Sequence, residues 1–217
     1  MKRMTEVLWT TVIPRSCVFT TAEAAAAAGT PVSQASRDLA LLARRNLIAR
    51  VVSGVWADTR NAHFSSYAVV PALVRMSAPG AVAYVSLLSA LSLHGMLSQL
   101  PRAIYVVSDR RIRRLRRTDI ATYQFYAMKP SLVGGFRRHQ SGSFDLATPE
   151  KAVFDVLYYS VRKGKRFAHL TGITLPHDFA VRGLMEWIDK IEYRPIRQAV
   201  MDRWRVLRAR PRDEGIA

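Results

Sequence analysis

An alanine-rich stretch, closed by a glycine and followed by a proline, most constrains how this chain can fold. Ala24–Ala28 is a run of strong helix formers, and Glu23 before it suits the positive end of a helix. Gly29 tolerates the left-handed conformation that ends helices, and Pro31 suits the first position of the next helix. The sequence therefore predicts two helices joined by a short turn.

The segments on either side of this helix pair complete a known order of elements. Residues 4–13 predict an earlier helix. Two β-rich runs, 47–52 and 55–57, flank Ser53 and Gly54 and predict a hairpin. Three helices followed by a hairpin is the order of a winged helix-turn-helix, in which small side chains let the second helix cross close to the third.

In such a module the third helix lies in the major groove, and its N-terminal part faces the base edges. Leu39 and Leu42 define the inward face of this helix, so its polar residues face outward. The candidate DNA contacts on and beside the helix are Thr30, Ser33, Gln34, Ser36, Arg37, Arg44 and Arg45. The candidates on the hairpin are Arg50, Ser53 and Gly54. Glutamine can pair with adenine and arginine with guanine, whereas the alternative is an ordinary solvated helix face.

A second basic feature is a run of six arginines within the eight positions 110–117. These are Arg110, Arg111, Arg113, Arg114, Arg116 and Arg117. On a helix, Ile112 and Leu115 would share one face with the arginines around it, and on a loop the run would be a bare electrostatic patch. We predict that the run neutralises DNA phosphates, with a solvated surface segment as the alternative.

The charge of the whole chain agrees with a polyanionic partner. Its 217 residues include 33 Lys and Arg against 16 Asp and Glu, a net charge of +17. Residues 1–60 have a net charge of +4, residues 61–150 of +7 and residues 151–217 of +6. Most of the excess therefore lies outside the segment expected to read bases, which predicts a division between base reading and phosphate attraction.

The rest of the chain predicts a larger mixed α/β domain with C-terminal helices, so we expect an α+β protein. The expected elements are a helix at 82–94, strands at 103–107, 120–128 and 144–146, a helix capped by Thr148, and amphipathic helices through 184–191 and 196–207. The expected domains are a winged module at 1–57, a connector with a helix at 58–80, the larger domain at 81–210 and a frayed tail at 211–217.

Two segments of the larger domain resemble the AbiEi-type antitoxin family. Tyr84–Gly95 reads YVSLLSALSLHG and Ala147–Asp155 reads ATPEKAVFD, and Lys151 stands where the family usually has arginine. The resemblance implies a bacterial transcriptional regulator that represses its own promoter at inverted repeats. It further implies an antitoxin that opposes a nucleotidyltransferase-like toxin without a stable complex, and a monomer in solution.

Other classes of function find less support in the sequence. Cys17 is the only cysteine, and the five histidines lack paired ligand spacing, so we predict no metal, cofactor or catalytic residue. A nuclease is the least favoured reading, because Glu150 and Lys151 are adjacent instead of separated by one residue. A stand-alone nucleic-acid-binding or protein-interaction module remains the alternative. We expect a cytoplasmic protein with no contact to a membrane, since the uncharged interval 76–101 is interrupted by Pro79, Gly80, Gly95, Gln99 and five serines.

Overall fold

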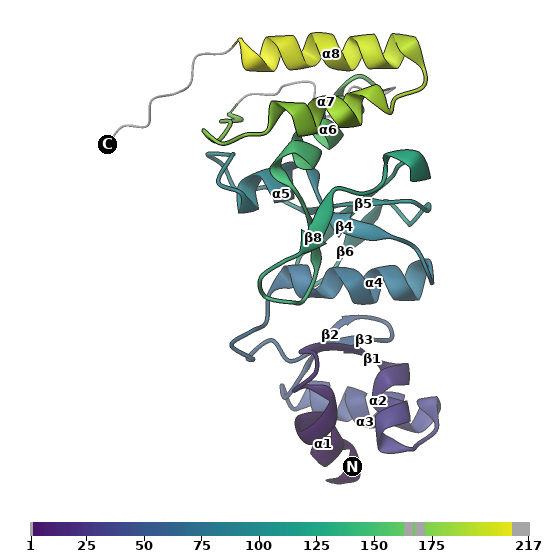
Figure 1. Ribbon diagram of the computed structural model, residues 1–217. Helices are drawn as coiled ribbons and strands as arrows, with labels where there is room; N and C mark the ends of the chain where they lie inside the picture. The colour runs from purple at the N-terminus through teal and green to yellow at the C-terminus, as the bar shows by residue number, and fades with distance from the viewer. Residues whose placement is uncertain (1, 163–166, 168–171, 210–217) are drawn as a thin grey trace, which may run out of the picture. The chain divides into compact units, whose positions relative to one another are not determined.

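The computed structural model describes residues 2–162, 167 and 172–209 and divides into two compact units (Figure 1). Unit 1 comprises Met1–Ala81 with Arg116–Thr122 and His139–Phe144, and unit 2 comprises Val82–Leu115, Tyr123–Arg138 and Asp145–Ala217. The described residues form eight α-helices and two β-sheets, so the fold is mixed α and β as predicted. The tail predicted at 211–217 lies outside the described residues.

Unit 1 begins with three helices in the predicted order. α1 (Lys2–Val7) continues into a π-helical turn (Leu8–Val12), and α2 (Thr21–Ala28) and α3 (Val32–Arg44) follow. The N-terminus of α2 is closed by a capping box. In this box the Thr20 hydroxyl accepts from the Glu23 backbone N–H at 3.1 Å, and the Glu23 carboxylate accepts from the Thr20 N–H at 2.6 Å. Gly29 ends α2 with φ of 59°, the left-handed conformation expected of it.

Small side chains let α2 and α3 pack closely. Ala24, Ala25 and Ala28 of α2 are buried, in the same core cluster as Leu39 and Leu42 of α3. Because the apolar side of α3 is used in this core, its polar side is left at the surface of unit 1.

A small antiparallel sheet in the order β1-β3-β2 completes the first part of unit 1. Its strands are β1 (Val18–Thr20), β2 (Ala49–Val52) and β3 (Val55–Ala57), and β2 and β3 form the predicted hairpin. Trp56 is buried, and its Nε1 donates to the Thr21 hydroxyl at 2.9 Å. This bond fixes the hairpin against the start of α2.

Unit 1 also contains residues that are distant in sequence from its helices. A 3₁₀ turn (Ser66–Val69) leads into α4 (Val70–Ser77). The Tyr67 ring stacks on Phe144 with centroids 5.2 Å apart, and Phe144 stacks on His139 at 4.6 Å. The unit is therefore assembled from three separate stretches of chain.

The larger sheet has six strands in the order β6-β7-β5-β4-β9-β8. The strands are β4 (Ala83–Val85), β5 (Ile104–Ser108), β6 (Leu115–Arg117), β7 (Thr122–Ala127), β8 (Phe136–Arg138) and β9 (Asp145–Ala147). β5 pairs with β7 and β4 with β9 in parallel, whereas β4 with β5 and β8 with β9 are antiparallel. The strands predicted near 103–107, 120–128 and 144–146 are thus present as β5, β7 and β9.

The single helix predicted for residues 82–94 is wrong. The segment divides into strand β4 and a shorter helix, α5 (Leu87–Leu93), with Ser86 between them. Tyr84 and Val85 pair with β5, and Leu87 has φ of 54°, which no continuous α-helix allows. Hydrogen bonding of β4 to a strand on each side outweighs the helix-like spacing of residues that predicted a single helix.

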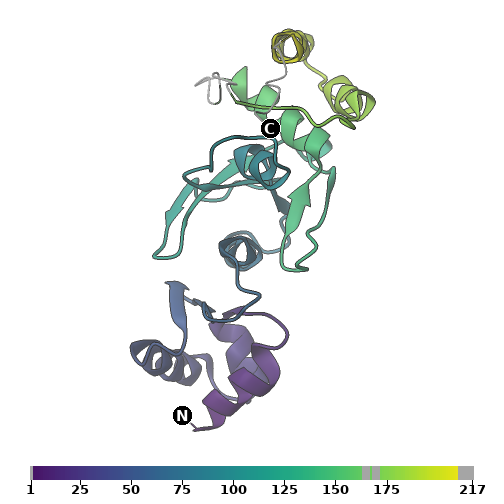
Figure 2. The same ribbon diagram turned by 90° about the vertical axis from the view of Figure 1, so that its left-hand side faces the viewer.

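Three helices complete unit 2. α6 (Pro149–Ser160) starts at the predicted cap, since the Thr148 hydroxyl accepts from the Lys151 N–H at 3.3 Å. α7 (Val181–Asp189) and α8 (Arg194–Arg208) are the two predicted C-terminal helices. They lie side by side, and Figure 2 shows both nearly end-on. Val200 and Trp204 of α8 are buried as their spacing predicts.

Among the described residues, no helix combines the length and hydropathy needed to span a bilayer.

A buried ion pair lies at the centre of unit 2. Lys151 and Asp155, one turn apart on α6, have side chains that are 0% exposed and are joined directly. Asp155 also accepts from the Ser86 hydroxyl at 2.6 Å and the Tyr84 hydroxyl at 3.3 Å. The Lys151 ammonium lies 4.7 Å from the Trp187 ring. Burial lowers the pKa of Lys151 and raises the pKa of Asp155, and the attraction between the two groups opposes both shifts.

We expect Lys151→Met and Asp155→Leu each to destabilise the protein by about 3–5 kcal/mol, because each leaves a buried charge without its partner. The double variant should lose less stability than the sum of the losses in the two single variants, since it removes both charges. Denaturant unfolding followed by circular dichroism measures these differences. As a control, Arg182→Ala and Glu186→Ala remove a pair whose side chains are 93% and 64% exposed, and should each change stability by less than about 1 kcal/mol. Equal effects for the buried and exposed pairs would contradict the role given to the buried one.

Candidate nucleic-acid interface

The exposed side of α3 carries a band of polar and basic residues. Ser33, Arg37 and Arg44 are exposed and lie within about 40° of one direction around the helix axis. Ser36 is also exposed, toward one edge of this band, and Gln34 is half-buried at the other edge. The structure therefore brings the predicted outward residues of α3 onto one side of the helix, with Arg37 near the middle.

The Arg37 side chain is held by Gln34, which is held in turn by Asp38. Its Nη2 donates to Gln34 Oε1 at 2.7 Å, and Gln34 Nε2 donates to Asp38 Oδ1 at 3.0 Å. Asp38 is only 7% exposed. The sequence analysis identified Arg37 and Gln34 but not the carboxylate behind them, although the spacing from Gln34 to Asp38 is that of neighbours on a helix.

The predicted hairpin residues lie at the β2–β3 turn. Arg50 Nη2 donates to the Ser53 hydroxyl at 3.2 Å, and the Arg50 guanidinium lies 5.6 Å from the centre of the Trp56 ring. Gly54 adopts φ of 82°, which favours glycine in a tight turn. The Arg50 side chain is thus oriented by neutral partners.

A groove lies between the C-terminal half of α3 and the hairpin, with a volume of about 590 Å³. Arg44 of α3, Arg50 of β2 and Arg60 of the following loop line it, together with Trp56. The acid in its lining is Asp119. Arg60 also lies 4.0 Å from the Asp58 carboxylate and donates to the Leu47 carbonyl at 2.9 Å. The lining has three arginines against one acid, and this excess of positive charge suits a phosphate backbone.

Two predicted contacts at the ends of α3 have different surroundings. The Thr30 hydroxyl oxygen is buried and has no hydrogen-bond partner among the described residues, so it is not part of the exposed surface. Arg45, by contrast, is exposed just after the last residue of α3. Leu41 is 41% exposed on the same side as Arg37, and the sequence analysis did not consider it. An exposed apolar side chain there can contact a thymine methyl group.

The arginine run is extended and forms no helix. Ile112 is buried, and the run ends in β6, so the arrangement combines the predicted loop with a short strand. Arg110, Arg111, Arg113 and Arg114 belong to unit 2 and are exposed, and Arg114 lies 5.7 Å from the Tyr126 ring centre. Unit 2 thus presents four exposed arginines within five positions.

Arg116 and Arg117 belong to unit 1 and differ in their surroundings. Arg117 is exposed, whereas Arg116 is half-buried and its Nη2 donates to the Ser77 hydroxyl at 2.7 Å. Arg116 Nε is buried and unpaired among the described residues. Arg116 is therefore an anchor within unit 1, and Arg117 is the one of the two that can meet a phosphate.

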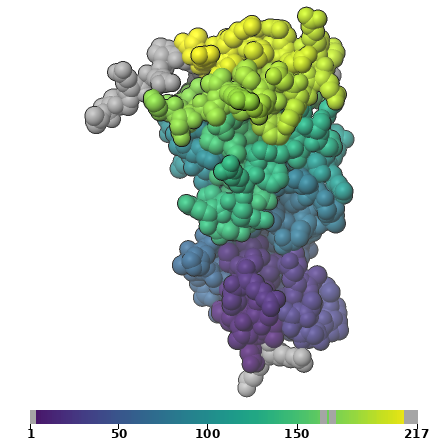
Figure 3. Space-filling view, viewed as in Figure 1, coloured from purple at the N-terminus to yellow at the C-terminus, as the bar shows by residue number. Residues whose placement is uncertain are grey.

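The solvent side of α8 carries arginines that the sequence analysis did not select. Arg194, Arg205 and Arg208 are exposed and Arg197 is half-buried, and Arg205 pairs with Asp202 at 2.9 Å. Figure 3 shows that α8, in yellow, forms a continuous outer surface in this view. Arg197 and Arg205 follow Arg194 by three and eleven residues, which are spacings of residues on one side of a helix. This pattern in the sequence could have identified the basic stripe.

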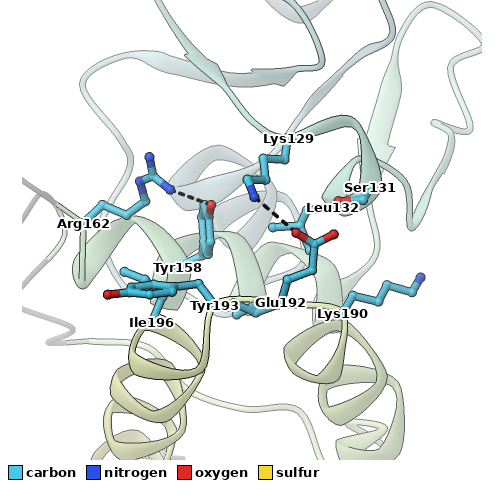
Figure 4. A pocket seen from close by; sticks show the side chains of 10 residues that line it. Lys129, Ser131, Leu132, Tyr158, Arg162, Lys190, Glu192, Tyr193 and Ile196 are labelled. Carbon is cyan, nitrogen blue, oxygen red and sulfur yellow. Dashed lines mark hydrogen bonds and ion pairs between the residues drawn. The ribbon is translucent and has the colours of Figure 1, made fainter.

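Unit 2 contains a pocket of about 240 Å³ between α6 and the start of α8 (Figure 4). Lys129 reaches across it to Glu192 at 3.4 Å, and Arg162 donates to the Tyr158 hydroxyl at 2.7 Å. Tyr193 lies at its edge and is exposed. The pocket is basic and aromatic, but one of its cations already has an acidic partner.

The residues considered for catalysis or metal binding have structural partners. Glu150 accepts from the Ala180 N–H at 3.3 Å, and Asp145 pairs with Arg138 at 3.1 Å. Lys151 is fully buried. Within the described part of the chain, no three of the His, Cys, Asp and Glu side chains come together as a metal site. The Cys17 thiol is buried, which raises its pKa.

Comparison of the chain with protein-family models and with curated proteins found no match.

We expect Arg116→Ala to lower the stability of the protein by about 1–2 kcal/mol, because it removes a charged donor and leaves the Ser77 hydroxyl without this partner. Arg117→Ala should change stability by less than about 0.5 kcal/mol, since the side chain is exposed. Thermal unfolding of the two variants checks this difference. Equal stabilities would show that Arg116 is not an anchor.

Proposed function

We propose that the protein is a sequence-specific DNA-binding transcriptional regulator and that unit 1 is a winged helix-turn-helix. The observation that carries the proposal is the convergence of Arg44, Arg50 and Arg60 on the groove between α3 and the hairpin. The helix order, the left-handed Gly29 and the close packing of α2 on α3 support it. In this reading α3 enters the major groove and the hairpin contacts the backbone or the minor groove.

The charge of unit 2 supports a second part of the proposal. Arg110, Arg111, Arg113 and Arg114 are exposed in a short extended segment, where guanidinium groups can pair with phosphates. We infer that this segment adds affinity for any duplex without adding sequence preference.

A further part of the proposal rests on the two motifs shared with AbiEi-type antitoxins. We propose that the protein represses its own promoter at inverted repeats, acts as a monomer in solution, and opposes a nucleotidyltransferase-like toxin without a stable complex. The motif residues Tyr84 and Ser86 contact Asp155 of the other motif in the buried network. The resemblance therefore concerns the interior of unit 2, and the DNA-binding proposal does not depend on it.

The proposal predicts that the protein binds the region upstream of its own gene far more tightly than random duplex at about 0.15 M salt. Arg37→Ala should weaken operator binding by about 10- to 100-fold, because one base contact is lost. Competition in an electrophoretic shift assay measures both effects. Arg15→Ala is the matched control, since Arg15 is exposed in unit 1 outside α3. Equal binding of operator and random duplex would overturn sequence-specific recognition and favour a non-specific nucleic-acid-binding module.

The arginine segment should affect the salt dependence instead. Replacing Arg110, Arg111, Arg113 and Arg114 by Gln should weaken binding to all duplexes alike and reduce the log–log salt slope by up to about 3.6, at about 0.9 for each phosphate. A control variant removes the same charge from exposed positions of unit 2 elsewhere. Its substitutions are Arg102→Gln, Lys129→Gln, Arg182→Gln and Lys190→Gln. Equal slope changes in the two variants would assign the effect to net charge alone.

A further inference from the structure

A chain of hydrogen bonds on α3 connects Asp38 through Gln34 to Arg37. Only one orientation of the Gln34 amide satisfies both partners, because the carboxylate can only accept and the guanidinium can only donate. The amide therefore connects a carboxylate that is 7% exposed to the arginine near the middle of the exposed side of α3.

This arrangement conflicts with base reading by Gln34. A glutamine that reads adenine uses its amide oxygen and nitrogen together on one base edge. In α3 the oxygen faces Arg37 and the nitrogen faces Asp38, on two sides of the amide. Turning the amide toward a base would break the hydrogen bond to the largely buried Asp38 carboxylate and leave that carboxylate without this donor.

The same arrangement orients the Arg37 side chain for contact with a base. The guanidinium has five N–H donors, and the bond to Gln34 comes from Nη2, so donors remain for a bidentate contact. A side chain that is already held loses less conformational entropy on binding. The bidentate partner that suits an arginine in the major groove is guanine, through O6 and N7.

We propose that α3 reads a guanine through Arg37 and that Gln34 is a positioning residue that holds this arginine and contacts no base. The inference rests on the proposed function, because it requires α3 to lie in the major groove. The inference adds the identity of the base that α3 reads. It also gives Gln34 a supporting role, whereas a glutamine at this position would by its residue type be expected to read adenine.

The test compares the base preferences of variants of the full chain in selections from a randomised duplex library. Arg37→Ala should lose the preference for guanine at one position of the selected site. Gln34→Ala should weaken the preference at that same position, and the double variant should be no worse than Arg37→Ala. Loss of preference for an adenine at a different position in Gln34→Ala, with additive effects in the double variant, would overturn the inference.

A second variant guards against loss of stability in Gln34→Ala. Gln34→Glu combined with Asp38→Asn exchanges the amide and the carboxylate, so a hydrogen bond between positions 34 and 38 and an acceptor for Arg37 are both kept. The inference expects this variant to keep the guanine preference, with any loss of affinity shared by all sequences. A base-reading side chain at position 34 would instead change its preference from adenine to cytosine, which would overturn the inference.

Selection with the wild-type protein distinguishes failure of the proposed function from failure of the positioning role of Gln34. A wild-type protein that selects no preferred site overturns the proposed function and the role of Arg37 together. A clear wild-type preference, with Gln34→Ala and Arg37→Ala acting at different base pairs, overturns the positioning role alone.

Discussion

The close packing of α2 against α3 determines which residues of α3 meet solvent. Ala24, Ala25 and Ala28 add almost no side-chain volume, so the apolar side of α3 reaches the core directly. Larger side chains at these three positions would push α3 outward or rotate it, and would change the direction in which Arg37 points. Since α3 is amphipathic, fixing its inner side also fixes its outer one.

Unit 2 depends on a different kind of constraint. Its central ion pair joins α6 to the residues before α5, through Tyr84 and Ser86, and lies against Trp187 of α7. Such a pair adds little net stability over well-packed apolar residues, but it disfavours any packing that leaves one charge unpaired. We interpret the pair as a device that selects one arrangement of these helices over other compact ones.

The sequence predicted those parts of the fold that local signals specify. The helix of the alanine run, the turn at Gly29 and the hairpin at Ser53–Gly54 depend on residues close in the chain, and all three are present. Strand β4 was missed because its three residues are held by pairing with β5 and β9, about which the local spacing of small residues gives no information. Among the site residues, spacing placed Arg37 at the surface, but the direction of the Gln34 amide depends on the burial of Asp38.

The assembly of unit 1 from three stretches of chain limits how the protein can be divided. Arg116–Thr122 and His139–Phe144 belong to the same unit as the first 81 residues, although Arg116–Thr122 includes residues of β6 and β7 and His139–Phe144 lies between β8 and β9. A fragment cut after Ala81 would lack the Phe144 ring that stacks on Tyr67 and the Arg116 side chain that binds Ser77. The protein thus has two compact units, but neither unit is one continuous stretch of the sequence. A gene fusion or a natural recombination event that moved residues 1–81 alone would transfer α1, α2 and α3 without some of the side chains that pack against unit 1.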